Sequence, residues 1–208
     1  MNILILASAP EQDYAYVKQL AQQADYVICA DGGLRHARAC GIQPDLEIGD
    51  FDSGNAPEDI PIIRLKPEKD DSDLMCCTKE ALKHDPDKIV YACASGGRLD
   101  HFLSNLSLLE YVEQHNCHAV LYDAQNRVSF HRGGAKYYRK DTQYSYVGII
   151  PLDEKLTGVT LRGLKYLLTD AVVHRSQMIT ISNEAVEDTY MISVEEGRSL
   201  VIESRDRA

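Results

Sequence analysis

Two aspartates on either side of a single phenylalanine have the residue types and spacing of a metal site. Residues 45–53 read "DLEIGDFDS", so Asp50 and Asp52 directly follow an apolar, strand-like run. Like charges this close repel each other, and such a pair on a turn normally needs a cation beside it. Taken alone, such a pattern is more often a solvated turn or a helix cap than a set of metal ligands. The metal interpretation therefore depends on partners elsewhere in the chain.

Three further segments offer such partners: "DGG" at 31–33, "KDDSD" at 69–73 and "SGGRLDH" at 95–101. Asp73 joins Asp50 and Asp52 as a hard oxygen ligand suited to Mg²⁺, which binds a few carboxylates together with substrate phosphate oxygens. Lys69 and Arg98 can meet phosphate. Backbone N–H groups can approach an anion at the glycines of helix starts, Gly32, Gly33, Gly96 and Gly97. The four segments together predict a metal–phosphate site for phosphoryl transfer.

Each of these segments also has a purely structural interpretation. "KDDSD" suits the charged start of a helix, with Ser72 as the N-cap and Asp73 favoured by the helix dipole. Gly96-Gly97 fits a plain turn, and His101 fits an ordinary surface histidine. The functional interpretation rests on the coincidence of all four segments at the ends of strands.

The first part of the chain alternates strand and helix patterns, which predicts the scaffold for these segments. Short apolar runs occur in "NILILA", "YVICA", "PDLEIGD", "KIVYACA" and "HAVLYD", and helical periodicity occurs in "EQDYAYVKQLAQQA", "DGGLRHARACG" and "DHFLSNLSLLEYVEQH". Alternation of this kind predicts a mostly parallel, Rossmann-like α/β sheet domain over residues 1–126. Ligands of such sheets bind at the carboxyl ends of the strands, where the four segments lie.

From residue 127 to 208 the pattern changes to short runs rich in Val, Ile, Thr and Tyr, separated by turn residues. The predicted strands are "RVSFHRG", "AKYYRK", "YSYVGIIPL", "GVTLRGLKYLL", "MITISN", "DTYMISV" and "SLVIESR". No helical pattern interrupts them. We therefore expect a C-terminal antiparallel β-sandwich over residues 127–208.

Composition narrows the class of protein. A net charge of −10 over 208 residues argues against a surface that binds nucleic acid or an anionic membrane. The six cysteines form no C-x-x-C pair, which favours structural thiols in a reducing compartment. The N-terminal apolar run is too short for a secretion signal, and no apolar stretch could span a bilayer. These features predict a soluble, cytoplasmic protein.

The ordered segments resemble the motifs of the thiamin pyrophosphokinase (thiamin diphosphokinase) family. The resemblance lies in "DGG", "PDLEIGDFDS", "KDDSD" and "GGRLDH" with Asn105, then in "YDAQNRV", "GLKYLL" and "SNE". It covers most of the chain in the same order. Ser72 replaces the threonine usual in the family, and Leu167 lies in a motif that varies.

The resemblance implies Mg²⁺-dependent transfer of a diphosphoryl group from ATP to the hydroxyl of thiamin, which leaves AMP. The metal ligands would be Asp50, Asp52 and Asp73, and the ATP contacts Asp31, Gly32, Gly33, Lys69, Asp70 and Arg98. Asp100 would contact thiamin and orient, or accept a proton from, its hydroxyl. Ser182 and Asn183 would form a thiamin-binding turn, although without the resemblance an ordinary hairpin turn explains them. The working unit would be a homodimer with shared active sites.

The residues leave three other functions open. A diphosphokinase for another small alcohol, such as a pterin, would use the same phosphate residues. An aspartate-nucleophile phosphohydrolase shares the Asp-x-Asp pattern, but there the motif should follow the first strand, whereas here it follows the third. A nucleotide-binding regulator without turnover would bind ATP and make no AMP.

Overall fold

The computed structural model describes residues 1–51, 57–66, 68 and 70–207, and Asp52 and Lys69 therefore lie outside the described residues. The chain divides into two compact units, Met1–Ala124 and Gln125–Ala208. Each is considered by itself below.

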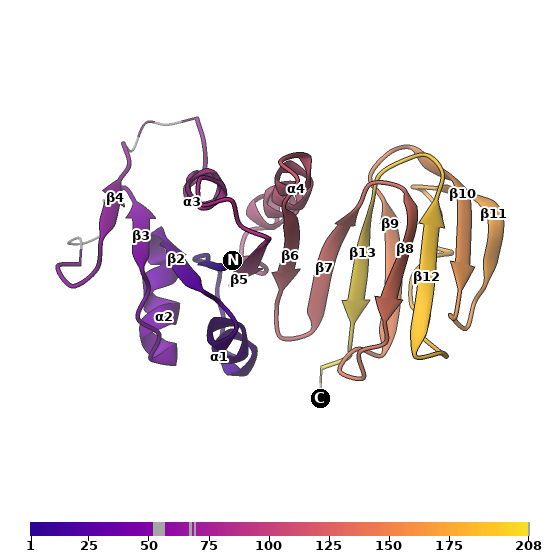
Figure 1. Ribbon diagram of the computed structural model, residues 1–208, viewed down its shortest axis with the longest axis horizontal. Coiled ribbons are helices and arrows are strands. Elements are labelled where there is room, and N and C mark those ends of the chain that lie inside the picture. Colours follow the sequence, from indigo (N-terminus) through magenta and orange to yellow (C-terminus); the bar gives the residue numbers. More distant parts are fainter. Residues whose placement is uncertain (52–56, 67, 69, 208) are drawn as a thin grey trace. The chain divides into compact units, whose positions relative to one another are not determined.

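A parallel sheet forms the centre of the first unit (Figure 1). Its strands lie in the order β4-β3-β2-β1-β5-β6, and all neighbouring pairs are parallel. Their bounds are β1 Asn2–Leu6, β2 Tyr26–Ala30, β3 Leu46–Gly49, β4 Ile62–Arg64, β5 Lys88–Ala92 and β6 His118–Tyr122. The order reverses between β1 and β5, because β2 and β3 are added on one side of β1 and β5 and β6 on the other. This predicts a ligand-binding crevice beyond the carboxyl ends of β1 and β5.

Helices cover both faces of this sheet. Their bounds are α1 Ala15–Gln22, α2 Leu34–Cys40, α3 Asp73–Leu82 and α4 Leu99–Gln114, and a short 3₁₀ turn, Asp31–Gly33, precedes α2. Crossovers between parallel strands are right-handed, so reversing the direction of strand addition moves the connecting helix to the opposite face. Figure 1 accordingly shows α1 and α2 on one side of the sheet and α3 and α4 on the other.

The strands of the first unit are apolar because both faces are covered. Leu4, Leu6, Val27 and Val90 belong to one buried cluster that packs against α1 and α2. Glu47 of β3 is an exception, since it is only 4% exposed and its Oε2 atom has no hydrogen-bond partner among the described residues. Burial raises the pKa of Glu47 to about 7.

The second unit is a sandwich of two antiparallel sheets. Its strands are β7 Asn126–His131, β8 Gly134–Arg139, β9 Tyr146–Pro151, β10 Lys155–Arg162, β11 Leu168–His174, β12 Thr189–Val194 and β13 Ser199–Ser204. One sheet has the order β7-β13-β9 and the other β11-β10-β12-β8. Residues of both sheets, among them Ile149, Val159, Ile192 and Val201, form one buried core. The predicted fold class, a parallel α/β part followed by an antiparallel sandwich, is confirmed.

Individual elements differ from the sequence prediction in three places. The short strand β4 was not predicted. The predicted strand "GVTLRGLKYLL" at 158–168 is the end of β10 followed by a turn, and β11, which begins at Leu168, was missed. The predicted strand "MITISN" at 178–183 is wrong. That segment meets β9 only through Thr180 and Asn183, and Met178, Ile179 and Ile181 are exposed. Within the residues that the structure describes, none of the helices has the length and apolarity to cross a membrane.

Candidate functional site

A cavity of about 640 Å³ opens at the carboxyl ends of the central strands of the first unit. It is lined by residues 7–10 after β1, 30–31 after β2, 71–74 at the start of α3, and 94 and 96–98 after β5. His101 and Asn105 of α4 complete the lining. The cavity thus lies at the reversal of strand order, where a parallel sheet of this kind binds its ligand.

Of the predicted site residues, Asp31, Asp73 and Arg98 line this cavity. Gly32, Gly33, Asp50, Asp70 and Asp100 are described but are not part of the lining. The structure therefore gathers residues of three predicted segments around one cavity: Asp31 from the first, 71–73 from the second, and 96–98 with His101 from the third. The described residues of the "DLEIGDFDS" segment are not part of the lining.

Sequence reasoning missed the loop after β1. Its residues Ser8, Ala9 and Pro10 line the cavity, and a methyl group at Gly97 would lie only 3.0 Å from Cδ of Pro10. The two loops therefore pack tightly against each other. The position of this loop in the chain could have identified it. It follows the first strand of an alternating strand–helix pattern, and the loops after central strands flank the crevice.

Two glycines allow the loop after β5 to turn into α4. Gly96 and Gly97 have φ values of +86° and +66°, a left-handed conformation that favours glycine. Arg98 then acts as the N-cap residue of α4, without a side-chain capping bond. The loop thus presents successive backbone groups and Arg98 to the cavity at a helix N-terminus, which is a favourable position for an anion.

Three non-glycine residues with positive φ follow three strands of the same sheet edge. Asp31 after β2, Phe51 near the end of β3 and Cys93 after β5 have φ values of +46°, +56° and +55°. Non-glycine residues in this conformation cost free energy and concentrate at functional sites. The backbone is thus strained around the predicted site.

The two glycines after Asp31 have a steric role. A methyl group at Gly33 would lie 2.1 Å from the carbonyl oxygen of Leu6, so only glycine fits against the end of β1. At Gly32 the nearest atom would be Cβ of Ser8, at 3.3 Å. The "DGG" segment therefore brings the start of α2 close to the loop after β1.

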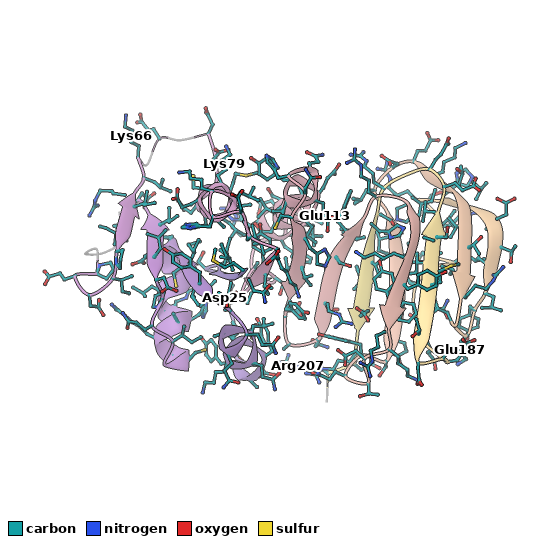
Figure 2. The ribbon with its side chains drawn as sticks, in the orientation of Figure 1. Asp25, Lys66, Lys79, Glu113, Glu187 and Arg207 are labelled. Atoms are coloured by element: carbon teal, nitrogen blue, oxygen red, sulfur yellow. The ribbon has the colours of Figure 1, made fainter. Side chains whose placement is uncertain are left out.

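Asp73 begins α3 at the edge of the cavity. Ser72 is the N-cap, as predicted, and its hydroxyl accepts a hydrogen bond from the backbone N of Met75 at 3.2 Å. The neighbouring Asp71 pairs with Nζ of Lys79, labelled on α3 in Figure 2, at 2.5 Å. Asp73 is the acidic residue in the first turn of α3, and Asp70 is exposed.

Arg98 and Asp100 form an exposed ion pair. Nε and Nη2 of Arg98 donate to the Asp100 carboxylate at 3.1 and 2.6 Å. The hydrogen bond from Arg98 lowers the pKa of the Asp100 carboxyl below its usual value. Asp100 is therefore an ionised hydrogen-bond acceptor near neutral pH and a weak base.

Asp50 lies directly after β3, on a turn that Arg64 of β4 holds. Nη1 of Arg64 donates to the carbonyl oxygen of Asp50 at 3.3 Å, and its guanidinium stacks over Phe51 with 5.0 Å to the ring centroid. Within the described residues, no three His, Cys, Asp or Glu side chains gather closely enough to hold a metal. Mg²⁺ commonly binds one or two carboxylates together with water and substrate phosphates, so Asp50 and Asp73 have suitable donor chemistry.

In the second unit, Ser182 and Asn183 have different environments. Ser182 is exposed, with a φ of +55°. Asn183 is only 4% exposed, and its Nδ2 donates to the carbonyl of Tyr166 at 2.7 Å while its Oδ1 accepts from the backbone N of Tyr166 at 2.9 Å. Its amide therefore holds the turn before β11, where Tyr166 and Leu167 are each 58% exposed.

The comparisons with known proteins assign both units to one family. The family model of the thiamin pyrophosphokinase catalytic domain matches residues 17–121. The model of the thiamin pyrophosphokinase vitamin B1 binding domain matches residues 137–199.

Relatives match over the whole chain. Thiamine pyrophosphokinase of Bacillus subtilis is 31% identical over 212 residues, which is 99% of both chains. The crystal structure of a Bacillus subtilis thiamine pyrophosphokinase has a TM-score of 0.88 at 30% identity, with all of both chains covered. The thiamin pyrophosphokinase structure from Geobacillus thermodenitrificans has a TM-score of 0.87 at 28% identity, covering 100% of this chain and 99% of that one. The chain therefore belongs to the thiamin pyrophosphokinase family.

Proposed function

We propose that the protein transfers the terminal diphosphoryl group of ATP to the hydroxyl of thiamin. The hydroxyl oxygen bonds to the β-phosphorus, the bond from that phosphorus to the bridging oxygen of the α-phosphate breaks, and AMP leaves with the bonding electrons. The hydroxyl proton passes to Asp100 or to solvent. The observation that carries this proposal is the cavity that joins Asp31, Asp73, the Gly96-Gly97 turn and Arg98 at the strand reversal.

The metal that this reaction needs is Mg²⁺, and we assign it to Asp50, Asp52 and Asp73. When bound, it would neutralise charge on the phosphate oxygens. Asp73 supplies a carboxylate from the cavity lining, and Asp50 supplies one from the turn held by Arg64. Asp52 belongs to the same motif and lies outside the described residues.

The ATP phosphates are assigned to the loop after β5 and to the basic residues. The turn at Gly96 and Gly97 offers backbone N–H groups at the N-terminus of α4. Arg98 uses Nε and Nη2 for Asp100, while no described residue accepts from its Nη1, so it can bind Asp100 and a phosphate together. Lys69, outside the described residues, and Asp70 retain their predicted ATP-binding roles.

Asp100 is assigned to orient the attacking hydroxyl. Its lowered pKa keeps it ionised, and an ionised carboxylate accepts a hydrogen bond from the alcohol. Proton acceptance by such a weak base is a minor contribution, because the transfer of a phosphoryl group depends mainly on positioning and charge.

We assign contacts with thiamin to the second unit also, in addition to Asp100 of the first unit. Ser182 has an exposed hydroxyl for hydrogen bonding, and Asn183 holds the neighbouring Tyr166 turn in place. The residues assigned to phosphate precede residue 102, whereas Ser182 lies in the other unit. We propose a two-fold homodimer in which each active site combines the first unit of one chain with the second unit of its partner.

The free cysteines suit a reducing compartment, and we place the enzyme in the cytoplasm.

One assay tests the assignment. The protein is incubated with thiamin, ATP and Mg²⁺, and the products are separated and identified. The expected products are thiamin diphosphate and AMP in equal amounts. Thiamin monophosphate with ADP would show transfer of a single phosphoryl group and would contradict the proposal. A parallel incubation with a pterin alcohol tests whether the acceptor is thiamin.

A further inference from the structure

Arg35 lies beside the cavity and is held by two hydrogen bonds. It is an exposed residue of α2. Its Nη2 donates to the carbonyl oxygen of Ser8, a residue of the cavity lining, and its Nε donates to Nε2 of His36 at 3.4 Å. A methyl group at Gly32 would lie 3.8 Å from its Nη1. The guanidinium therefore lies between the "DGG" turn and the loop after β1.

His36 is a buried neighbour that can accept the hydrogen bond from Arg35 in its neutral form. Its side chain is 2% exposed, and its Nδ1 lies 2.9 Å from the hydroxyl of Tyr14. Burial and the adjacent charge of Arg35 lower the pKa of His36. A neutral imidazole accepts at one nitrogen, so Nε2 can take the Arg35 hydrogen bond while Nδ1–H points to Tyr14.

The charge of Arg35 is not compensated by a neighbouring carboxylate. Three other basic residues of the first unit, for example, have such partners, in the pairs Arg98–Asp100, Lys79–Asp71 and Arg38–Asp59. Among the described residues, no carboxylate lies within ion-pair distance of Arg35. In addition, Nη1 of Arg35 has no acceptor in the described parts of the chain.

The described lining of the cavity carries more acidic than basic side chains. Asp31, Asp71 and Asp73 line it, whereas Arg98 is the basic residue of its described lining. A nucleotide triphosphate needs cationic partners, and an arginine held in a fixed orientation can donate a charge-assisted hydrogen bond to a phosphate oxygen.

We propose that Arg35 is a further phosphate-binding residue of the nucleotide site, held in place by Ser8 and His36. This inference rests on the proposed function, since it takes ATP as the ligand of the cavity. Its Nη1 donates to a phosphate oxygen while Nη2 and Nε keep their protein partners. The competing role is a purely structural one, in which Arg35 only ties α2 to the loop after β1.

Equilibrium binding separates these roles. The full-length protein, Arg35→Met and Arg35→Lys are titrated calorimetrically with ATP and Mg²⁺, and separately with adenosine. Arg38→Met is the matched control, since Arg38 lies on the same helix and pairs with Asp59. Arg35→Met should weaken ATP binding about tenfold to a hundredfold and leave adenosine binding unchanged. Arg35→Lys should recover part of the loss because it keeps the charge.

Three results would overturn the proposal: equal weakening of ATP and adenosine binding, an effect no larger than that of Arg38→Met, or a lysine variant no better than methionine. The proposed function can be contradicted independently of this inference. A protein that binds ATP through Arg35 but makes no thiamin diphosphate would retain this inference and lose the activity, whereas a protein that does not bind ATP would lose both.

Discussion

Asn105 of α4 donates a hydrogen bond from Nδ2 to the carbonyl oxygen of Ala94 at 2.8 Å, and so closes the loop that carries Gly96, Gly97 and Arg98. Both residues line the cavity. The bond fixes the two ends of a loop whose glycines have left-handed conformations. Asn105 therefore positions the loop that is assigned to phosphate.

Replacing Asn105 by Leu should loosen this loop. The loss of one hydrogen bond predicts a decrease of about 1 kcal/mol in the free energy of unfolding. The kcat/KM for ATP should fall further, by about tenfold or more, because small displacements of positioning groups are costly in catalysis. Steady-state kinetics and denaturant unfolding measure the two effects. Ser107→Ala, an exposed change on the same helix, is the control, and equal kinetic effects of both changes would contradict the positioning role.

Neutralising the proposed metal ligands should abolish turnover without unfolding the protein. Asp52→Asn and Asp73→Asn keep the side-chain size and remove a carboxylate charge. Each should lower kcat by about a thousandfold, because charge developed on the phosphates loses its counter-ion. Asp85→Asn is the matched control, since Asp85 is exposed and lies outside the cavity lining. Near-normal turnover of Asp52→Asn, with unchanged Mg²⁺ dependence, would return residues 50–53 to the role of a solvated turn.

Ser182 and Asn183 should differ when each is replaced by alanine. Asn183→Ala removes a buried amide that binds both backbone groups of Tyr166, and a decrease of about 2 kcal/mol in the free energy of unfolding is expected. Ser182→Ala should leave stability nearly unchanged and raise the KM for thiamin. Thermal unfolding and thiamin kinetics measure both. A thiamin KM that Ser182→Ala leaves at the wild-type value would remove Ser182 from the site.

Mixing two inactive variants tests the shared active site. Asp52→Asn inactivates the first unit, and Ser182→Lys should repel the thiazolium cation from the second. After random subunit exchange about half of the dimers are mixed, and each mixed dimer has one intact site of two, so activity should recover to about a quarter of wild type. Exchange demonstrated by mass spectrometry, with no recovered activity, would show that each site is built within one chain.

Glu47 should make the stability of the protein depend on pH. Its pKa is raised from 4.5 to about 7 by burial, so the folded state retains a proton that the unfolded state has already released. Stability should therefore fall as the pH rises from about 4.5 to 7. Glu47→Gln should remove this decrease and be more stable at pH 8 by about 3 kcal/mol. The free energy of unfolding of the wild type and of Glu47→Gln, measured at pH 5 and pH 8, checks this prediction. An equal decrease in stability in both proteins would exclude Glu47 as the cause.

The sequence predicted the order of helices and strands along the chain better than it predicted which short segments pair as strands at the edges of the sheets. Alternating apolar runs predicted the parallel sheet, and buried strands such as Lys88–Ala92 were recognised because both faces are covered. The strand Ile62–Arg64 was missed because three residues with exposed ends carry no period. Residues 178–183 were predicted as a strand because they are rich in β-branched residues, but Ile179 and Ile181 are exposed and the segment bonds to β9 only at Thr180 and Asn183. Local composition does not show which backbone groups find a partner.

For the site, residue types predicted the cluster but not its internal bonds. Asp31, Asp73 and Arg98 follow different elements and still line one cavity, because parallel strands end at one edge. The pairing of Arg98 with Asp100 and the use of Asn183 as a brace for Tyr166 depend on side-chain directions that spacing does not specify.

The left-handed backbone at Asp31, Phe51 and Cys93 makes the sheet edge that carries the site less stable than the sheet itself. Such strained segments open locally at a lower free energy than the packed core. On gradual heating, the first unit should therefore lose its affinity for nucleotide while its strands are still intact. Under the proposed function, bound nucleotide opposes that opening, so added ATP should raise the temperature at which the first unit loses its affinity for nucleotide.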